Sequence, residues 1–154
     1  MSNDADISAD ILIVGGGMVG ATLGITLSGA GLKVALADRL ASGSDTAKSY
    51  DGRASAIANG SVNILKGIGV WPHLEAIASP IWDIRVADGH PLRGISPLFL
   101  HYDHSDVGAS PFGYIIENRS VREALGTVAS DCKSLKLVHS ANVVSVQRGP
   151  FGVL

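Results

Sequence analysis

The sequence has a single cysteine, Cys132, among its 154 residues. One thiol cannot form a disulfide within the chain, so the fold depends on its core, as is usual in reducing compartments. A large net charge is also missing, because 12 basic and 14 acidic residues nearly cancel and leave a net charge of only -2. This balance excludes the broad basic surface that binds nucleic acid through charge, and we expect no nucleic-acid partner.

Long apolar runs are missing as well. No stretch approaches the roughly 18 apolar residues of a membrane-spanning helix. The first ten residues, MSNDADISAD, are polar and acidic, without the basic start and apolar centre of a secretory signal or the arginine-rich pattern of a transit peptide. These features predict a cytoplasmic protein.

Charged residues of either sign are few as well. Only 17% of the residues are charged and the mean hydropathy is +0.29, whereas about 25% charged residues is usual for a soluble domain. The C-terminal stretch VVSVQRGPFGVL alternates like a strand up to Gly149-Pro150 and then restarts, as in a hairpin. Together these features predict a fragment whose apolar surface is normally covered by a missing part of the same protein.

What is abundant is glycine, and it gathers after an apolar run. The residues Ile11-Leu12-Ile13-Val14 predict a strand buried on both faces of a parallel sheet. The stretch VGGGMVG (14–20) follows, and apolar spacing predicts a helix from Gly17 to about Ala30. A second strand is expected over 33–37, which completes a β-α-β unit.

The glycines fit the pattern G-x-G-x-x-G at Gly15, Gly17 and Gly20. In this pattern the first glycine permits a tight turn, the second lets backbone approach a pyrophosphate, and the third lets helix and strand pack closely. Asp38 ends the second strand, where a carboxylate accepts hydrogen bonds from a ribose. The candidate cofactor-binding residues of this unit are Gly15, Gly17, Met18, Val19, Gly20, Asp38 and Arg39.

The β-α-β unit predicts an ADP-containing dinucleotide but does not distinguish FAD from NAD. Asp38 would repel a 2′-phosphate, which argues against NADP at this site. Arg39 could attract such a phosphate, but a single arginine after a strand is more often exposed to solvent. Three hypotheses follow: a flavin enzyme, an NAD-dependent dehydrogenase with a Rossmann domain, and a non-catalytic dinucleotide-binding module.

Two further segments carry a family resemblance over residues 9–154. With DGRASAI (51–57) and ENR (117–119), the chain resembles the flavin-dependent aromatic hydroxylases of ubiquinone biosynthesis, among the para-hydroxybenzoate hydroxylase-like monooxygenases. The resemblance implies that Arg53 reaches the FAD pyrophosphate and ribityl region. It further implies that Arg119 opens a helix near the flavin and that backbone near Val143 contacts adenine.

The resemblance also implies a fold and an activity. The fold class is α/β, with a Rossmann-like FAD-binding domain on a parallel sheet and the start of a β-rich substrate region. The implied enzyme is a monooxygenase that hydroxylates the aromatic ring of a polyprenylated ubiquinone precursor with NAD(P)H and O2. No catalytic residue is identified, and the chain alone is expected to be inactive. Expected partners are the hydrophobic aromatic substrate, the missing C-terminal half, and a homodimer or ubiquinone-biosynthesis complex, in the cytoplasm or peripheral at the inner face of the membrane.

The expected organisation follows the chain. The predicted parts are a disordered tail (1–9), the FAD-binding core and following helices (10–80), strands of the substrate-domain type (81–112), and a truncated return to the FAD-binding domain (113–154). Within them we expect a loop at 41–53, helices at 56–66 and 120–129, and a short helical turn closed by Pro80. Strands are expected at 81–87, 97–103, 113–118, 135–139 and 143–147.

Two remaining features favour ordinary structural roles. His101 and His104 would point to opposite faces of a strand and so could not share one metal ion, and no metal site is predicted. Trp71 and Trp82 are expected to be core or domain-interface aromatics.

Overall fold

The computed structural model describes residues 7–39, 52–150 and 152–153. The chain divides into two compact units, the first formed by Met1–Asp51 with Val121–Leu154 and the second by Gly52–Ser120. Most of the predicted N-terminal tail and nearly all of the predicted 41–53 loop lie outside the described residues.

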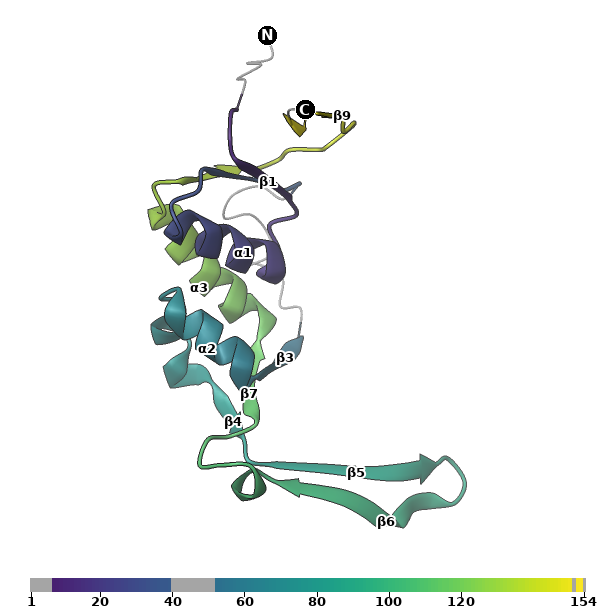
Figure 1. The fold of residues 1–154 in the computed structure, drawn as a ribbon. Helices are drawn as coiled ribbons and strands as arrows, with labels where there is room; N and C mark the ends of the chain where they lie inside the picture. The colour runs from purple at the N-terminus through teal and green to yellow at the C-terminus, as the bar shows by residue number, and fades with distance from the viewer. Residues whose placement is uncertain (1–6, 40–51, 151, 154) are drawn as a thin grey trace. The chain divides into compact units, whose positions relative to one another are not determined.

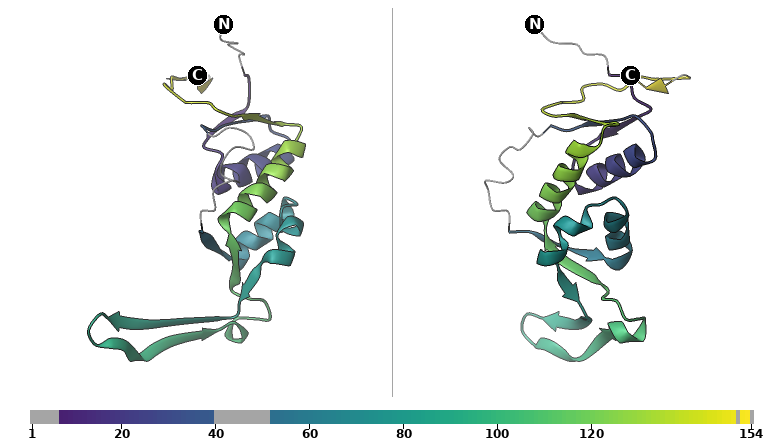
Figure 2. Two further views of the ribbon diagram at one scale, coloured as in Figure 1. Left: turned by 180° about the vertical axis from the view of Figure 1, so that it is seen from behind. Right: turned by 90° about the vertical axis from the view of Figure 1, so that its left-hand side faces the viewer.

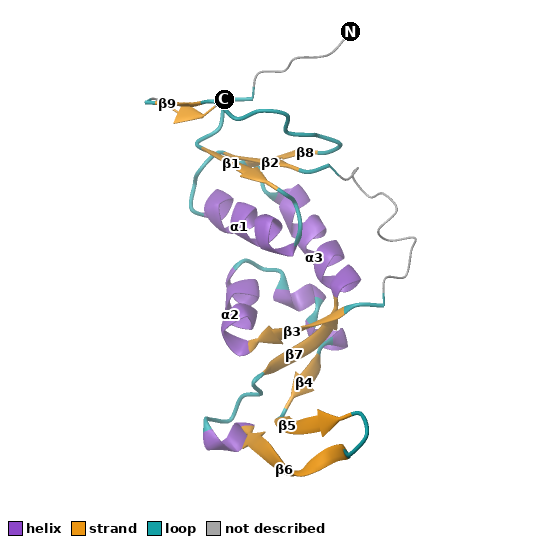
Figure 3. Cartoon of the chain, turned by 90° about the vertical axis from the view of Figure 1, so that its right-hand side faces the viewer, coloured by secondary structure: helices purple, strands orange, loops and turns teal. Residues whose placement is uncertain are grey.

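The first unit is built on a parallel sheet, which confirms the predicted α/β fold (Figure 3). Its strands are β1 (Ile11–Val14), β2 (Val34–Ala37) and β8 (Leu135–Val138). They lie in the order β1-β2-β8 with both neighbouring pairs parallel. Helix α1 (Met18–Gly29) joins β1 to β2, so the predicted β-α-β unit is present.

The sheet of the first unit corrects one prediction. Strand β1 is not buried on both faces, because Leu12 and Val14 are 50% and 61% exposed while Ile13 is buried. Helix α1 lies on one side of the sheet, and no described helix lies on the other side (Figure 3). The wholly apolar composition of β1 therefore does not mean that both of its faces are covered here.

Helix α3 (Asn118–Asp131) leads into β8, as expected from the 120–129 pattern. The predicted strand at 143–147 is wrong, because residues 141–147 have no regular secondary structure and Val144 and Val146 are exposed. The only strands described after β8 are β9 (Arg148–Gly149) and β10 (Gly152–Val153), which form a short antiparallel pair. An alternating pattern forms a strand only where a neighbouring strand satisfies its backbone groups, and no described strand pairs with 143–147.

The second unit contains an antiparallel sheet in the order β3-β7-β4. Its strands are β3 (Ala54–Ala58), β7 (Gly113–Glu117) and β4 (Ser79–Ile81). Helix α2 (Asn59–Gly67) begins three residues later than the predicted helix at 56–66. Residues 54–58 pair with β7 over their whole length, so this distant pairing overrides the local helical pattern.

The core of the second unit lies beside two short 3-10 helices, η1 (Trp71–His73) and η2 (Glu75–Ile77), which confirm the predicted helical turn. Pro80 lies inside β4 rather than ending this turn. Leu74, Val62, Val70 and Ile116 are fully buried. Trp71 is buried as expected and packs edge-on against Tyr114, with 4.9 Å between the ring centroids.

A long antiparallel hairpin completes the second unit and confirms the two strands predicted around its turn. It consists of β5 (Asp83–His90) and β6 (Gly94–Asp103), and it extends away from the β3-β7-β4 sheet (Figures 1 and 2). Its base is followed by the short helix η3 (His104–Asp106). Trp82 at this base is 43% exposed and packs against the His104 ring, so it is not a core residue, and the expectation that it lies at a domain interface stays a prediction.

Candidate dinucleotide site

The glycine-rich stretch forms a tight turn at the carboxyl end of β1. Gly15 has φ +103°, a backbone conformation that side chains disfavour, and its N–H donates a 2.8 Å hydrogen bond to the carbonyl of Ala37. This bond joins the turn to the end of β2. Ligands of open parallel sheets bind outside the carboxyl ends of the strands, and the turn lies at this edge.

The amino end of α1 opens directly from this turn. Gly17 is the N-cap residue, and no side chain accepts a hydrogen bond there. The first N–H groups of a helix have no partner within the helix and carry the positive end of its dipole, so those of Met18, Val19 and Gly20 suit an anion. A Cβ added to Gly17 would meet no atom within 4 Å, which leaves the approach to these groups open.

Gly20 and Gly24 let α1 lie close to the strands. A Cβ on Gly20 would be 1.9 Å from the carbonyl oxygen of Gly15, and a Cβ on Gly24 would be 3.2 Å from Leu135 Cδ1. The helix start can therefore sit on the turn only because position 20 has no side chain.

Asp38 follows β2 and lies beside the same turn. Its backbone N–H donates to the carbonyl of Val138, and its carbonyl accepts from the N–H of Ala141, both at 2.9 Å. Its carboxylate accepts a hydrogen bond from the N–H of Gly16. Gly16 was not among the residues predicted for the site, and the only sequence signal for it is that three glycines stand in a row.

The other two candidates of the first unit are on the surface. Arg39 follows Asp38 and is exposed. Val143 is 40% exposed and lies two residues beyond Ala141, whose hydrogen bond holds that segment next to the end of β2. The structure thus brings the glycine turn, Asp38 and the segment leading to Val143 together at one edge of the sheet.

Arg53 and Arg119 belong to the second unit, where pairing of β3 with β7 brings them to the same end of one sheet. Ala54 pairs with Glu117, and the N–H of Asn118 donates to the carbonyl of Arg53 at 3.0 Å. Arg119 forms a 3.3 Å ion pair with Glu117, and the two side chains are 42% and 52% exposed. The family resemblance implied that both arginines lie near the flavin, but the spacing of residues in the sequence gave no reason to place them together.

A buried polar contact fixes this end of the sheet. Ser55 Oγ donates a 2.6 Å hydrogen bond to Oδ1 of Asn118, and Asn118 is itself buried. Because buried hydrogen-bonded polar groups fix geometry, this contact sets where β7 ends and α3 begins. It thereby sets the backbone position of Arg119.

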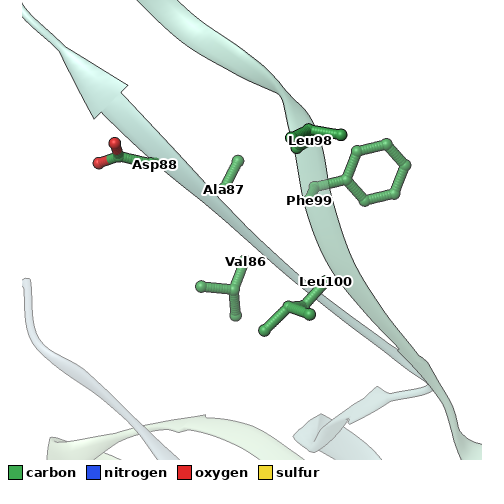
Figure 4. A pocket seen from close by; sticks show the side chains of 6 residues that line it. All are labelled: Val86, Ala87, Asp88, Leu98, Phe99 and Leu100. Atoms are coloured by element: carbon green, nitrogen blue, oxygen red, sulfur yellow. The ribbon is translucent and has the colours of Figure 1, made fainter.

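The β5–β6 hairpin has two different faces. Cross-strand pairing puts Ile84 opposite Tyr102 and Val86 opposite Leu100 on one face. The other face carries Arg85 opposite His101, with His101 Nε2 lying 2.6 Å from Asp83 Oδ1. An open groove of about 480 Å³ lies along the hairpin and is lined by Val86, Ala87, Asp88, Leu98, Phe99 and Leu100 (Figure 4).

Neither histidine of the HYDH stretch belongs to a metal cluster. His101 pairs with Asp83, while His104 contacts the Trp82 ring and lies 3.4 Å from Asp103. Among residues 7–39, 52–150 and 152–153 there is no group of three or more potential metal ligands. In the same ranges no helix has the length and apolarity required to cross a bilayer.

A glycine turn, an open helix start and a carboxylate at the end of the second strand define a dinucleotide-binding protein of the Rossmann type. Residues 8–139 match the family described as the FAD binding domain. The chain therefore belongs to this family, and the flavin family indicated by DGRASAI and ENR is confirmed.

Two curated relatives show the similarity in sequence. The chain is 40% identical over 153 residues to the ubiquinone hydroxylase UbiL of Rhodospirillum rubrum, covering 99% of this chain and 34% of the relative. It is 32% identical over 122 residues to the 3-demethoxyubiquinol 3-hydroxylase of Escherichia coli, covering 75% of this chain and 29% of the relative. The chain thus spans about a third of the length of these relatives.

Solved structures show the same fold. The flavin-dependent monooxygenase PieE, solved with FAD and substrate, matches with a TM-score of 0.73 at 22% identity, covering 96% of this chain and 26% of that one. The p-nitrophenol 4-monooxygenase PnpA from Pseudomonas putida matches with a TM-score of 0.68 at 18% identity, covering 94% of this chain and 37% of that one.

The residues present fit the ADP part of FAD. The space in front of Gly17 is open, the helix start carries no capping side chain, and Asp38 stands at the neighbouring strand end. The pyrophosphate would be met by backbone N–H groups of the turn and helix, and the ribose by the Asp38 carboxylate.

Proposed function

We propose that this chain is the N-terminal FAD-binding portion of a flavin-dependent monooxygenase, which hydroxylates the aromatic ring of a polyprenylated ubiquinone precursor using NAD(P)H and O2. The observation that carries the proposal is the open glycine turn beside Asp38, in a chain of the FAD-binding family. The similarity to the ubiquinone hydroxylase UbiL and to the 3-demethoxyubiquinol 3-hydroxylase of Escherichia coli supports the substrate class.

In this proposal the candidate residues bind and orient the cofactor. The N–H groups of Met18, Val19 and Gly20 hold the pyrophosphate, and Asp38 holds the adenosine ribose. Val143 lies by the adenine, and Arg39 remains a candidate contact at the same edge. A bound flavin supplies the redox chemistry of the reaction.

Arg53 and Arg119 would supply positive charge to the phosphate and flavin end of the cofactor. A guanidinium presents a planar set of donors that fits phosphate oxygens. The β3–β7 pairing and the Ser55–Asn118 contact support this proposal, because they hold both arginine backbones at one end of the sheet.

The apolar surfaces suggest what the chain normally contacts. The exposed residues Ile84, Val86, Leu100 and Tyr102 form one face of the hairpin. Exposed apolar patches of this kind mark interaction sites. We propose that the remaining length of the enzyme, its hydrophobic aromatic substrate or a second subunit covers such surfaces, in the cytoplasm or at the inner face of the membrane.

The absorption spectrum of the complete purified protein tests the cofactor. Flavin bands near about 370 and 450 nm, a property of the cofactor itself, are the expected result. A colourless protein that binds NAD instead would favour the NAD-dependent dehydrogenase. Binding of a dinucleotide without oxygen-dependent turnover of a quinone precursor would favour a non-catalytic module.

Arg53→Ala tests the residue that separates these functions most sharply. We expect lower FAD retention and lower hydroxylase activity together, because phosphate charge would be less compensated. Arg93→Ala, a loop arginine at the tip of the hairpin, serves as the control and should retain flavin. Full flavin content and turnover in Arg53→Ala would remove Arg53 from the site.

A further inference from the structure

Gly16 is enclosed by Asp38 in a way that the dinucleotide motif does not require. Its N–H donates a hydrogen bond to Asp38 Oδ2. A Cβ added at position 16 would lie 3.0 Å from Oδ2 and 3.1 Å from Cβ of Asp38. Position 16 is a variable position of G-x-G-x-x-G. In this chain, however, the Asp38 carboxylate accepts the hydrogen bond of the Gly16 N–H and occupies the space that a side chain at position 16 would need.

The position of Asp38 is fixed independently of this contact. Its N–H and C=O both form 2.9 Å hydrogen bonds, to Val138 and from Ala141. With a single methylene between backbone and carboxyl, an aspartate held in this way has little freedom. A carboxylate has about four lone-pair sites, so accepting one N–H does not exhaust its capacity.

We propose that Asp38 is a positioning residue that holds the glycine turn in its binding conformation before any ligand arrives, and that position 16 must be glycine for this reason. Identification of the ligand as FAD rests on the proposed function above. The contact aligns the turn with the start of α1, and a turn ordered in advance costs less conformational entropy when the dinucleotide binds. Asp38 would then act twice, through Gly16 on the turn and directly on the ribose.

A role for Asp38 in ribose binding alone makes different predictions. Asp38→Asn retains one carbonyl oxygen that can accept from Gly16 but removes the negative charge, whereas Asp38→Ala removes both. Gly16→Ala leaves the carboxylate intact but places a methyl group against it. Gly29→Ala is the matched control, because it lies at the end of α1 and an added Cβ there meets nothing within 4 Å.

The first measurement needs no ligand. Hydrogen exchange of the Gly16 amide is followed by NMR in the longest polypeptide that contains this chain. We expect at least tenfold slower exchange in the wild type and in Gly29→Ala than in Asp38→Ala, with most of the protection retained in Asp38→Asn. Equal exchange rates in the wild type and Asp38→Ala would overturn the proposal.

The second measurement is FAD affinity of the same variants. We expect Gly16→Ala and Asp38→Ala each to weaken FAD binding about tenfold or more, and the affinity of Asp38→Asn to lie between those of Asp38→Ala and the wild type. The double variant Gly16→Ala/Asp38→Ala should bind FAD no more weakly than Asp38→Ala, because the two substitutions remove one shared contact. Multiplying effects in the double variant, or wild-type affinity in Gly16→Ala, would overturn the proposal. If the wild type binds no FAD, the proposed function fails, while amide exchange still decides whether Asp38 holds the turn.

Discussion

Substitution of Gly20 by alanine tests how closely α1 must approach the glycine turn. The added Cβ would lie 1.9 Å from the Gly15 carbonyl oxygen, 3.1 Å from its carbon and 3.4 Å from Ile13 Cγ2. An ordinary contact is at least 3.4 Å, so the helix or the turn would have to move by about 1.5 Å, the difference between these two distances. Backbone atoms of a turn that is hydrogen-bonded to Ala37 cannot swing away as a side chain tip can.

Overpacking of this kind costs about 1–3 kcal/mol. A domain of this size loses roughly 2–4 °C of melting temperature per kcal/mol, so we expect a decrease of about 2–12 °C. Thermal unfolding followed by circular dichroism measures this decrease. Gly29→Ala in the same helix controls for helix propensity and should melt at the wild-type temperature or slightly above it, because its Cβ meets no neighbour.

The FAD affinity of Gly20→Ala should fall as well, because displacement of the helix start moves the N–H groups proposed to hold the pyrophosphate. A melting temperature equal to that of the wild type would show that the approach of α1 to the turn is not tight. The account of this glycine would then be refuted.

Three further predictions follow from other contacts. Gly17→Val should lose FAD binding while retaining its melting temperature, because its Cβ meets no atom of the chain within 4 Å; wild-type affinity in a fluorescence titration would exclude Gly17 from the pyrophosphate site. The Ser105 hydroxyl and N–H donate to Asp103 and hold the pKa of Asp103 below its ordinary value of 3.8. The contribution of these hydrogen bonds to stability is therefore present at neutral pH and is lost as the pH falls through the lowered pKa. An NMR titration should show that the pKa of Asp103 rises in Ser105→Ala, and an unchanged pKa would contradict the assignment. The isolated 154-residue chain should dimerise or aggregate through its exposed apolar residues, and a monodisperse monomer in light scattering would contradict this.

Residues that are close in sequence were the easiest to predict. The β-α-β unit could be recognised because its apolar strand, glycine turn, helix and Asp38 follow one another within about thirty residues. The helical turn near Trp71 and both strands of the hairpin were likewise predicted from short local patterns, although the observed strands run further than the predicted ones.

The features that could not be predicted depend on segments far away in the sequence. Residues 54–58 form β3 because β7 supplies hydrogen bonds from far along the chain, and a local reading assigned part of this stretch to a helix. The opposite error occurred at 143–147, where an alternating pattern has no described partner strand. Burial on both faces of β1 was also predicted wrongly, because composition does not say what covers a sheet.

The candidate site divides in the same way. Gly15, Gly17, Gly20 and Asp38 come from a spacing pattern with a known physical basis, but the contact between Gly16 and Asp38 could be seen only in the structure. Arg53 and Arg119 came from the family resemblance rather than from residue chemistry. Their position at one end of the β3–β7 pair follows from strand register, which the sequence did not specify.

We propose above that this chain binds a dinucleotide through its ADP portion at the glycine turn and Asp38. The most direct test is an equilibrium titration of the complete purified protein with FAD, with ADP and FMN as competitors. We expect that FAD binds, that ADP competes with it, and that FMN, which lacks the adenosine phosphate, competes poorly or not at all. Competition by FMN but not by ADP would contradict the account, because the flavin would then be held without the site that the glycine turn and Asp38 form.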